Sequence, residues 1–415
     1  MRFPAGLRAL QHRDFRLFIS GQLVSLIGTW MQSVAQSWLV LELTNSPFKL
    51  GLIGTLQYSP ILCFSFVAGV IADRLPKRRV IIGTQTALMC QAFVLAFLAW
   101  TGHVRYWHVA ILATCYGLAN TLDMPTRQSF IVEMASKGDL TNAIALNSAM
   151  VNGARMVGPA VAGLLVDRYG VAPAFALNGL SFLAVILALA AMRAEGLPRQ
   201  EKGSAVGAEI AAGIRYALGT PLVALVLSLL MIVSLFVINH SVMVPLLARD
   251  VLHVGAHGFG LLMAALGTGA IVGALTLATL VKGQPSPSLV IGGAVAASGL
   301  TLLLGGIRNF WVAMGVLILV GLSQIVFLAS ANTTLQMVVP DRMRGRIMSL
   351  YAFVWVGVTP IGSLFVGAIA EWFGVSAAYT VGGGVGLACV LGLGLVWKHA
   401  RARSDSAAST PPPLP

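Results

Sequence analysis

The chain has 415 residues, of which 57% are hydrophobic and only 10% are charged. Soluble domains carry about a quarter charged residues, so this composition excludes an ordinary soluble protein. Apolar stretches of roughly 20 residues, the length that crosses the hydrocarbon core of a bilayer, recur along the whole sequence. The sequence therefore predicts an all-α integral membrane protein that contacts the lipid bilayer along most of its length.

Twelve membrane-spanning helices are predicted from these runs. In the first half they are expected near residues 17–41, 50–72, 80–101, 107–126, 143–166 and 172–192. In the second half they are expected near residues 221–245, 259–281, 288–305, 310–334, 347–370 and 376–397. The first run is too long and too polar for a signal-peptide core, so we expect it to be retained as a span.

This arrangement predicts four segments. Residues 1–192 form an N-terminal six-helix bundle, and residues 221–398 form a C-terminal six-helix bundle. Between them, residues 193–220 are polar and are expected to be a cytoplasmic linker with a surface helix near residues 208–218. Residues 399–415 end in a Ser, Thr and Pro-rich run, which predicts a disordered cytoplasmic tail.

The net charge of +13 could indicate nucleic-acid binding, but the positions of the basic residues exclude it. Most of the 27 Lys and Arg residues fall in segments on one side of the predicted bilayer, which the positive-inside rule assigns to the cytoplasm. Both termini are then cytoplasmic, and we expect a multi-pass protein of a bacterial inner membrane. The exceptions are Lys49, Arg105, Arg168, Arg249 and Arg308 outside, and Arg155 within a span.

A faint duplication relates the two halves. Sliding the chain by 204 residues superposes many glycines at equivalent span ends, and also places Asp167 on Glu371. Examples are Gly51 with Gly255, Gly158 with Gly362, Gly163 with Gly367 and Gly170 with Gly374. Two parallel six-span halves predict a binding site near the bilayer midplane between them.

The turn between the second and third spans has a distinctive sequence. It contains Gly69, Asp73, Arg74, Arg78 and Arg79, and it resembles the corresponding loop of major facilitator superfamily transporters. Pro76 departs from the pattern, because the family usually has glycine there. On the alternative interpretation the cluster only sets topology. The resemblance implies that Asp73 gates transport by meeting the start of the eleventh span near Arg346, where free N–H groups favour an anion.

Two further regions extend this resemblance over about residues 10–398. Gly158 and Pro159 resemble a Gly-Pro motif in the fifth span of proton-coupled drug antiporters, although ordinary small-residue packing is an equal alternative. Asp123-Met-Pro-Thr-Arg127-Gln and the run from Leu335 to Ser349, with Arg344 and Arg346, resemble the branch that contains the enterobactin exporter and macrolide-efflux-like permeases. We expect Gly158, Pro159, Arg344 and Arg346 to act in gating.

Polar side chains in the apolar spans predict a cavity. In the first span Gln22, Ser25, Thr29, Gln32 and Gln36 share one face, which would either line a cavity or bind neighbouring helices. The full set of candidate substrate-binding residues is Gln32, Gln36, Tyr58, Asn239, Gln324, Asn332 and Arg155. Arg155 would neutralise an anionic substrate or pair with an acid such as Asp123, and Asp123 would alternatively pair with Arg127 four residues on.

These observations predict a secondary transporter that exports a small amphipathic molecule, such as a drug or a siderophore, by proton antiport. Asp123, Glu42 and His240 are the candidate proton carriers. An uptake symporter or a lysophospholipid flippase of the same fold is the alternative, and a sensor is a further one. A membrane enzyme or ATPase is disfavoured because its motifs are missing from the sequence. The four cysteines lack metal-type spacing, and we expect a monomer with no metal or cofactor.

Overall fold

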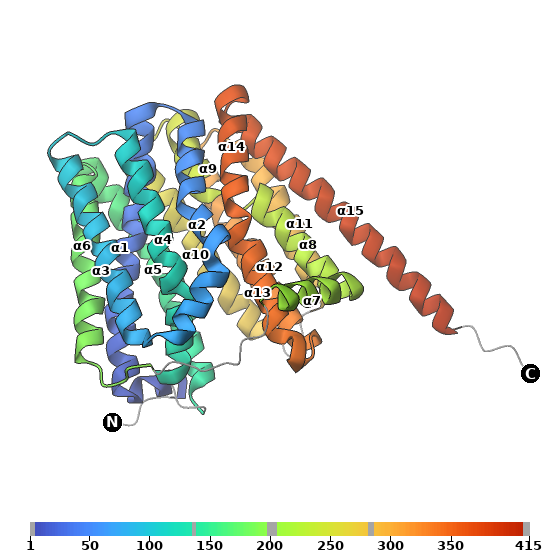
Figure 1. The fold of residues 1–415 in the computed structure, drawn as a ribbon. Helices are drawn as coiled ribbons and strands as arrows, with labels where there is room; N and C mark the ends of the chain where they lie inside the picture. Colours follow the sequence, from blue (N-terminus) through green and yellow to red (C-terminus); the bar gives the residue numbers. More distant parts are fainter. Residues whose placement is uncertain (1–4, 135–137, 197–205, 281–285, 410–415) are drawn as a thin grey trace, which may run out of the picture.

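A computed structural model describes residues 5–134, 138–196, 206–280 and 286–409. The side chains of Phe66, Val70 and Asp73, and those of residues 5–6, 206–210, 280 and 400–409, lie outside this description. Within these ranges every regular element is a helix (Figure 1). The expected surface helix in the linker falls mostly within α7, and the expected disordered tail is partly helical, because α15 continues to Ser409.

The first half forms long helices that lie side by side. After the short η1 (Ala5–Gln11), they are α1 (Arg13–Thr44), α2 (Pro47–Arg74), α3 (Lys77–Trp100), α4 (Tyr106–Met134), α5 (Leu140–Tyr169) and α6 (Ala172–Ala191). Their bounds lie within a few residues of the predicted spans, except that α4 continues beyond residue 126 to Met134.

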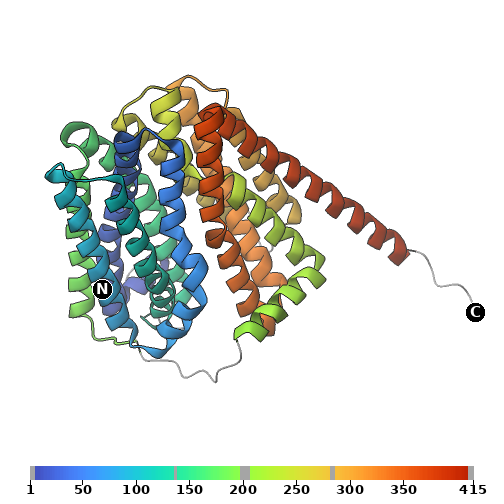
Figure 2. The ribbon, with the colours of Figure 1, turned by 45° about the horizontal axis from the view of Figure 1, so that its top comes forward.

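The second half follows the short α7 (Val206–Gly219). Its elements are α8 (Pro221–Phe236), α9 (His240–Leu246), η2 (Leu247–Val251), α10 (Ala256–Leu280), α11 (Pro287–Leu304), α12 (Phe310–Val338), α13 (Asp341–Gly357), α14 (Thr359–Phe373) and α15 (Val375–Ser409). The C-terminal part of α15 leans away from the other helices (Figures 1 and 2).

Local sequence explains several helix ends. Asn45 adopts a left-handed conformation with a φ of 51° and ends α1, and the Ser46 side chain then accepts a hydrogen bond from the Lys49 N–H. Pro47 follows in the first turn of α2, where a missing N–H costs nothing. Gly170 and Gly374, with positive φ values of 75° and 86° that glycine adopts readily, end α5 and α14. The turns at one end of the molecule are therefore short and locally specified.

Two predicted spans are interrupted, which the sequence analysis did not anticipate. The span expected at 221–245 breaks between α8 and α9 at Val237–Asn239, and the amide of Asn239 bonds the carbonyl of Leu235. The span expected at 347–370 breaks at Val358, just before Pro360. Proline cannot donate to the preceding turn, so an N–H of the helix is lost there.

Ten helices or joined helices of the described chain are long and apolar enough to cross a membrane. They include α8 to η2 taken together and α13 with α14. The remaining long helices, α2 and α4, have 28 and 29 residues. The sequence and structure thus agree that the protein is a multi-pass, all-helical membrane protein.

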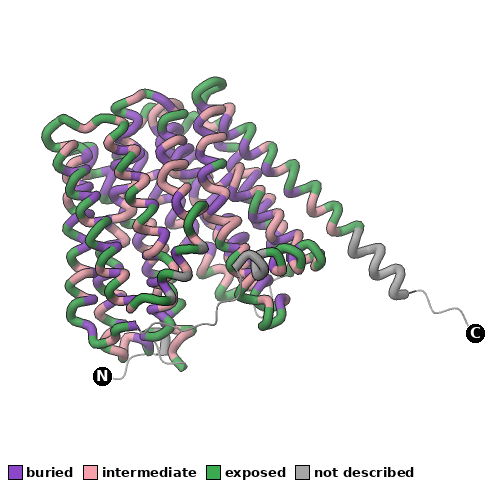
Figure 3. Tube along the Cα trace, viewed as in Figure 1, coloured by how far each residue is buried: buried purple, intermediate pink, exposed green. Residues whose placement is uncertain are grey.

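The helices pack in two groups. In one, α1 packs on α5 and α6, α2 on α4, and α3 on α4 and α6; in the other, α10 packs on α12, and α11 on α12 and α15. Extensive contacts between α5 and α10 and between α2 and α14 join the groups. Buried positions run along the facing sides of the helices in both (Figure 3). The two main seams between the groups therefore each involve one pair of helices.

Glycine lets α10 and α12 approach backbone to backbone. A Cβ built on Gly321 would lie 2.0 Å from the carbonyl oxygen of Leu266, and one on Gly269 would lie 1.9 Å from that of Ile318. Small residues allow this close approach, which membrane helices use because apolar side chains gain little by leaving lipid. Gly315, on the same helix as Gly321, has no such neighbour within 4 Å.

We predict that Gly321→Ala destabilises the protein by about 1–3 kcal/mol, because the added methyl group separates α10 from α12. Gly315→Ala should be neutral or slightly stabilising, since alanine favours a helix and its methyl group meets open space. Thermal unfolding of the two purified variants in detergent, followed by size-exclusion chromatography, measures the difference. Equal melting temperatures for both variants would contradict the close-packed seam.

Candidate functional site

The two ends of the helix bundle differ in charge. The end that we name the basic end carries the η1 segment, the α2–α3, α6–α7 and α12–α13 connections, and residues Arg74, Arg78, Arg79, Arg344 and Arg346. The opposite end carries the connections α1–α2, α3–α4, α5–α6, η2–α10, α11–α12 and α14–α15. This distinction matters because the two helix groups meet differently at the two ends.

At the opposite end the groups touch through backbone atoms. A Cβ on Gly51 of α2 would lie 2.4 Å from the carbonyl oxygen of Ser363 in α14, and Gly367 lies beside it. On the other seam, a Cβ on Gly163 of α5 would lie 2.9 Å from the Cα atom of Gly260 in α10. These contacts leave no room for side chains, so the structure is closed at this end along both seams.

Towards the basic end the seam of α2 changes, because α2 packs extensively on α14 and only sparsely on α13. Gly69, near the end of α2 and in helical register with Gly51, has no atom within 4 Å of a built Cβ outside its own chain neighbours and helix backbone. On the other seam α5 still meets α10 backbone to backbone at Met156 and Gly267. The contrast along α2 indicates that this seam is looser towards the basic end.

Two acidic residues hold the closed end. The carboxylate of Glu371, at the end of α14, accepts hydrogen bonds from Ser46 Oγ at 2.8 Å and from the N–H of Phe48 at 3.0 Å. It therefore binds the N-terminus of α2, where free N–H groups favour an anion. Asp167 of α5 lies against Gly255, next to the start of α10. The duplication paired these two acids, but neither was predicted as a site residue.

Near the middle of the helices, polar side chains from both groups converge. The Arg155 guanidinium lies over the Trp30 ring, 5.4 Å from its centroid, and within electrostatic range of Tyr58 and His240. His240 in turn lies near the side chain of Gln324. Four predicted candidates, Arg155, Tyr58, His240 and Gln324, are thus brought together. We name these four residues and Trp30 the central cluster.

A small pocket adjoins the central cluster. Gln36, Gln57, Tyr58 and Ser241 are among its lining residues, and Gln36 Nε2 donates to Gln57 Oε1 at 3.0 Å. Its volume of about 20 Å³ holds a water molecule but no substrate. Gln36 therefore lies where the sequence analysis expected it, beside the space between the two groups.

Gln32 lies elsewhere, although it shares a helix face with Gln36. Its amide donates to Gln91 of α3 at 2.9 Å and accepts from Asn178 of α6 at 2.7 Å. All three side chains are buried. Gln32 thus binds helices of its own group, which is the alternative that the sequence left open.

Two further cavity candidates also have partners of their own. Asn239 Nδ2 donates to the Leu235 carbonyl, and its Oδ1 lies 3.5 Å from Ser363 Oγ. Asn332 accepts a hydrogen bond from Gln336 on the exposed side of α12. The structure therefore places both outside the central cluster.

The candidate proton carriers differ in environment. Asp123 is fully buried between α3 and α4, where it pairs with Arg127 at 2.6 Å and accepts hydrogen bonds from Thr84 and Gln85. Glu42 is exposed and accepts a hydrogen bond from Trp38. His240 belongs to the central cluster. Of the two partners that the sequence allowed for Asp123, the structure shows Arg127.

The gating candidates lie at the basic end and, for Gly158 and Pro159, nearer the middle of the helices. The side chain of Asp73, on which the gating hypothesis depends, lies outside the described side chains. Arg78 donates to the carbonyl of Ala190, Arg344 pairs with Asp341 at 2.7 Å, and Arg74 and Arg79 are exposed. Arg346 packs on Gly213 of α7. Gly158, which precedes Pro159, packs against the backbone of α1 at Trp30.

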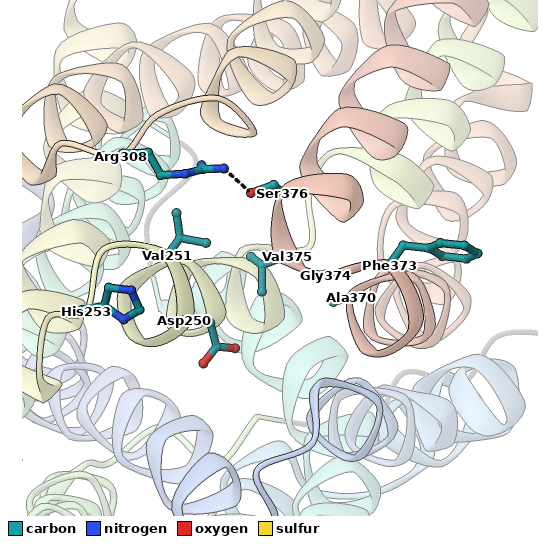
Figure 4. A pocket seen from close by; sticks show the side chains of 9 residues that line it. All are labelled: Asp250, Val251, His253, Arg308, Ala370, Phe373, Gly374, Val375 and Ser376. Atoms are coloured by element: carbon teal, nitrogen blue, oxygen red, sulfur yellow. Dashed lines mark hydrogen bonds between the residues drawn. The ribbon is translucent and has the colours of Figure 1, made fainter.

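A larger pocket lies away from this axis. It has a volume of about 480 Å³ at the opposite end and is lined by η2, the end of α14, the start of α15 and the turns beside them (Figure 4). Its charged residues already have partners, because Arg308 bonds Ser376 and Asp250 pairs with Arg249. We therefore place the functional site at the central cluster, where polar atoms from both groups meet.

Comparison with known families settles the class of protein. A family model described as transmembrane secretion effector matches residues 5–414. The chain belongs to this family of the major facilitator superfamily. It is therefore a membrane transporter and not an enzyme, as the sequence predicted.

Curated relatives within the superfamily are exporters and transporters of small molecules. The chain is 24% identical to the staphyloferrin A transporter of Staphylococcus aureus, over 89% of this chain and 92% of the relative. It is 26% identical to the enterobactin exporter of Citrobacter koseri, over 97% and 95%. The multidrug efflux pump Tap of Mycolicibacterium fortuitum is 24% identical, over 88% and 90%.

Solved structures show the same fold. A crystal structure of a POT family transporter superposes with a TM-score of 0.75 at 12% identity, covering 94% of this chain and 96% of that chain. A bacterial homologue of the human lysosomal transporter Spinster, in an inward-facing and unoccupied conformation, gives a TM-score of 0.68 at 13% identity, covering 92% and 95%. At such low identity the likeness concerns the fold alone.

We predict that Glu371→Ala loosens the closed end, because α2 loses both hydrogen bonds to the carboxylate. The carboxylate is exposed, so the loss is roughly 1 kcal/mol, or about a fivefold shift towards an open end. Labelling of a cysteine placed at Ser37, in a background without native cysteines, by a membrane-impermeant maleimide from that side measures the shift. Glu42→Ala, which removes another exposed acid at this end, is the control. Equal labelling in both variants would contradict the role of Glu371 in holding this end closed.

A second prediction distinguishes the structural role of Gln32 from the substrate-binding role of Gln36. Gln32→Ala should lower stability by about 1 kcal/mol, because Gln91 and Asn178 lose a partner within the membrane. Gln36→Ala should leave the melting temperature nearly unchanged and alter the apparent KM for substrate. Melting curves and transport assays on both variants decide the matter. A stable Gln32→Ala variant with an altered KM would reverse the assignment.

Proposed function

We propose that the protein is a secondary active exporter that works by alternating access and is driven by proton antiport. The observation that supports this proposal is the difference between the two ends of the helix bundle. Backbone contacts close one end, α2 has only sparse contacts with α13 at the other, and the central cluster lies between the two groups at mid-height. Rocking one group against the other would expose this cluster to each side in turn.

The proposal includes an orientation and a domain arrangement. Two bundles, residues 1–192 and 221–398, would each contribute six spans, with α2 and α4 completing the twelve. The basic end would face the cytoplasm of a bacterial inner membrane, following the positive-inside rule, and the protein would act as a monomer. In this orientation the described conformation is open to the cytoplasm, ready to receive a molecule for export.

The proposed substrate is a small amphipathic molecule of the drug or siderophore type. The relatives, siderophore transporters and a multidrug efflux pump, support export of such compounds. The aromatic surfaces of Trp30 and Tyr58 beside a cation supply the matching apolar and polar contacts.

Asp123 is the proton carrier that we would test first. It is fully buried, and protonation would remove its ion pair with Arg127 and free Arg127 to move. Glu42 and His240 remain candidates, and Asp73 is proposed to gate by binding the N-terminus of α13 when the basic end closes.

Inverted membrane vesicles with an acidified lumen test the proposal. We predict that siderophores or drugs from a panel dissipate the proton gradient in wild-type vesicles, seen as recovery of a quenched acridine dye. Asp123→Asn and Asp73→Asn should each slow the recovery at least about tenfold, whereas Asp250→Asn, at the opposite end, should not. Substrate accumulation in wild-type vesicles without any proton movement would contradict antiport.

A further inference from the structure

The central cluster contains a cation that no described acidic side chain neutralises. Among the described ion pairs, none includes Arg155. Among the acids on the described helices, Asp123 lies furthest from a helix end, and it pairs with Arg127. The ring of Trp30 stabilises the guanidinium in part, through its negative face. A cation at this depth is costly without a partner, which indicates that the partner comes from elsewhere.

The unpaired polar atoms of the cluster point to the same conclusion. Arg155 Nε, His240 Nε2 and Gln324 Nε2 are buried and lack hydrogen-bond partners in the described part of the chain. An arginine Nε and an amide nitrogen can only donate hydrogen bonds. They come from α5, α9 and α12, so both helix groups contribute unpartnered polar atoms to the central cluster. A group that accepts hydrogen bonds and carries negative charge would satisfy them together.

The surroundings define the rest of the ligand. Trp30 and Tyr58 present aromatic rings beside the guanidinium, and flat apolar groups stack well on such rings. A ligand with a planar body could therefore place its charged group on Arg155 and its rings against Trp30 and Tyr58.

We propose that the central cluster binds organic anions, with a carboxylate or similar oxyanion on Arg155 and a planar apolar body against Trp30 and Tyr58. This inference rests on the proposed function, because it names the substrate class of the proposed export site. Arg155 supplies the charge, and Gln324 donates a further hydrogen bond. Charge, and not size alone, then decides which molecules are exported.

Two dyes with the same planar core and opposite charge test the assignment. Carboxyfluorescein is an anionic xanthene, and rhodamine 123 is a cationic one. Fluorescence anisotropy measures their binding to the purified full-length protein in nanodiscs. We expect the wild type to prefer carboxyfluorescein and Arg155→Gln to weaken its binding at least about tenfold. Arg155→Lys should retain part of the affinity, because it keeps the charge and loses the planar fork.

Arg168→Gln is the matched control, since it removes a cation from the same helix at an exposed position. It should bind carboxyfluorescein as the wild type does. Equal carboxyfluorescein affinity in the wild type and Arg155→Gln would overturn the proposal, as would a wild-type preference for rhodamine 123 or binding of neither dye. Melting temperatures of both glutamine variants exclude unfolding as the cause of lost binding.

Transport separates this inference from the proposed function. Energised inverted vesicles that accumulate rhodamine 123 and not carboxyfluorescein would support an exporter and refute the anion site. Arg155-dependent binding of carboxyfluorescein without movement of either dye would support the anion site and count against export. Accumulation of carboxyfluorescein that Arg155→Gln abolishes and Arg168→Gln preserves would support both.

Discussion

The scarcity of water inside a bilayer governs this structure, because each buried polar group there needs a partner within the protein. Asp123 has three described side-chain partners, and Gln32 has two. These groups join helices of one half. Arg155, His240 and Gln324 differ from them, because each keeps a buried nitrogen without a hydrogen-bond partner in the described part of the chain and none belongs to such a network. Their position between the two helix groups is where a transporter would keep bonding capacity for its cargo.

The sequence predicted the helices well because hydrophobic run length is a direct signal in a membrane protein. Twelve expected spans correspond to helical segments with closely similar bounds for most of them. The breaks at Val237–Asn239 and Val358 were missed because an interruption of one or two residues leaves the run apolar. Pro245 and Pro360 were available signals, but proline in a membrane helix does not by itself locate the break.

The site was predicted only in part, since a helix face does not say which neighbour it meets. Gln32 and Gln36 lie one turn apart, yet one contacts α3 and α6 and the other contacts α2. The placement of α3 beside α6 decides this, and hydropathy carries no information about it. The duplication showed a similar limit. It paired Gly51 with Gly255, whereas Gly260 makes the contact with Gly163 that corresponds to that of Gly51 with Gly367.

Corrected in this way, the duplication explains how the closed end is built. Glu371 meets residues 46–48 before and within the first turn of α2, and Asp167 meets Gly255 just before α10. Each acid thus lies at the N-terminus of a helix in the other group, where partial positive charge is concentrated. The proposed role of Asp73 at the start of α13 is the same interaction at the basic end. Since rocking opens one end as it closes the other, acids at helix N-termini at both ends would stabilise each conformation in turn. Where the two ends are held with similar strength, both states are populated, and a bound substrate or proton needs only a small free energy to select between them.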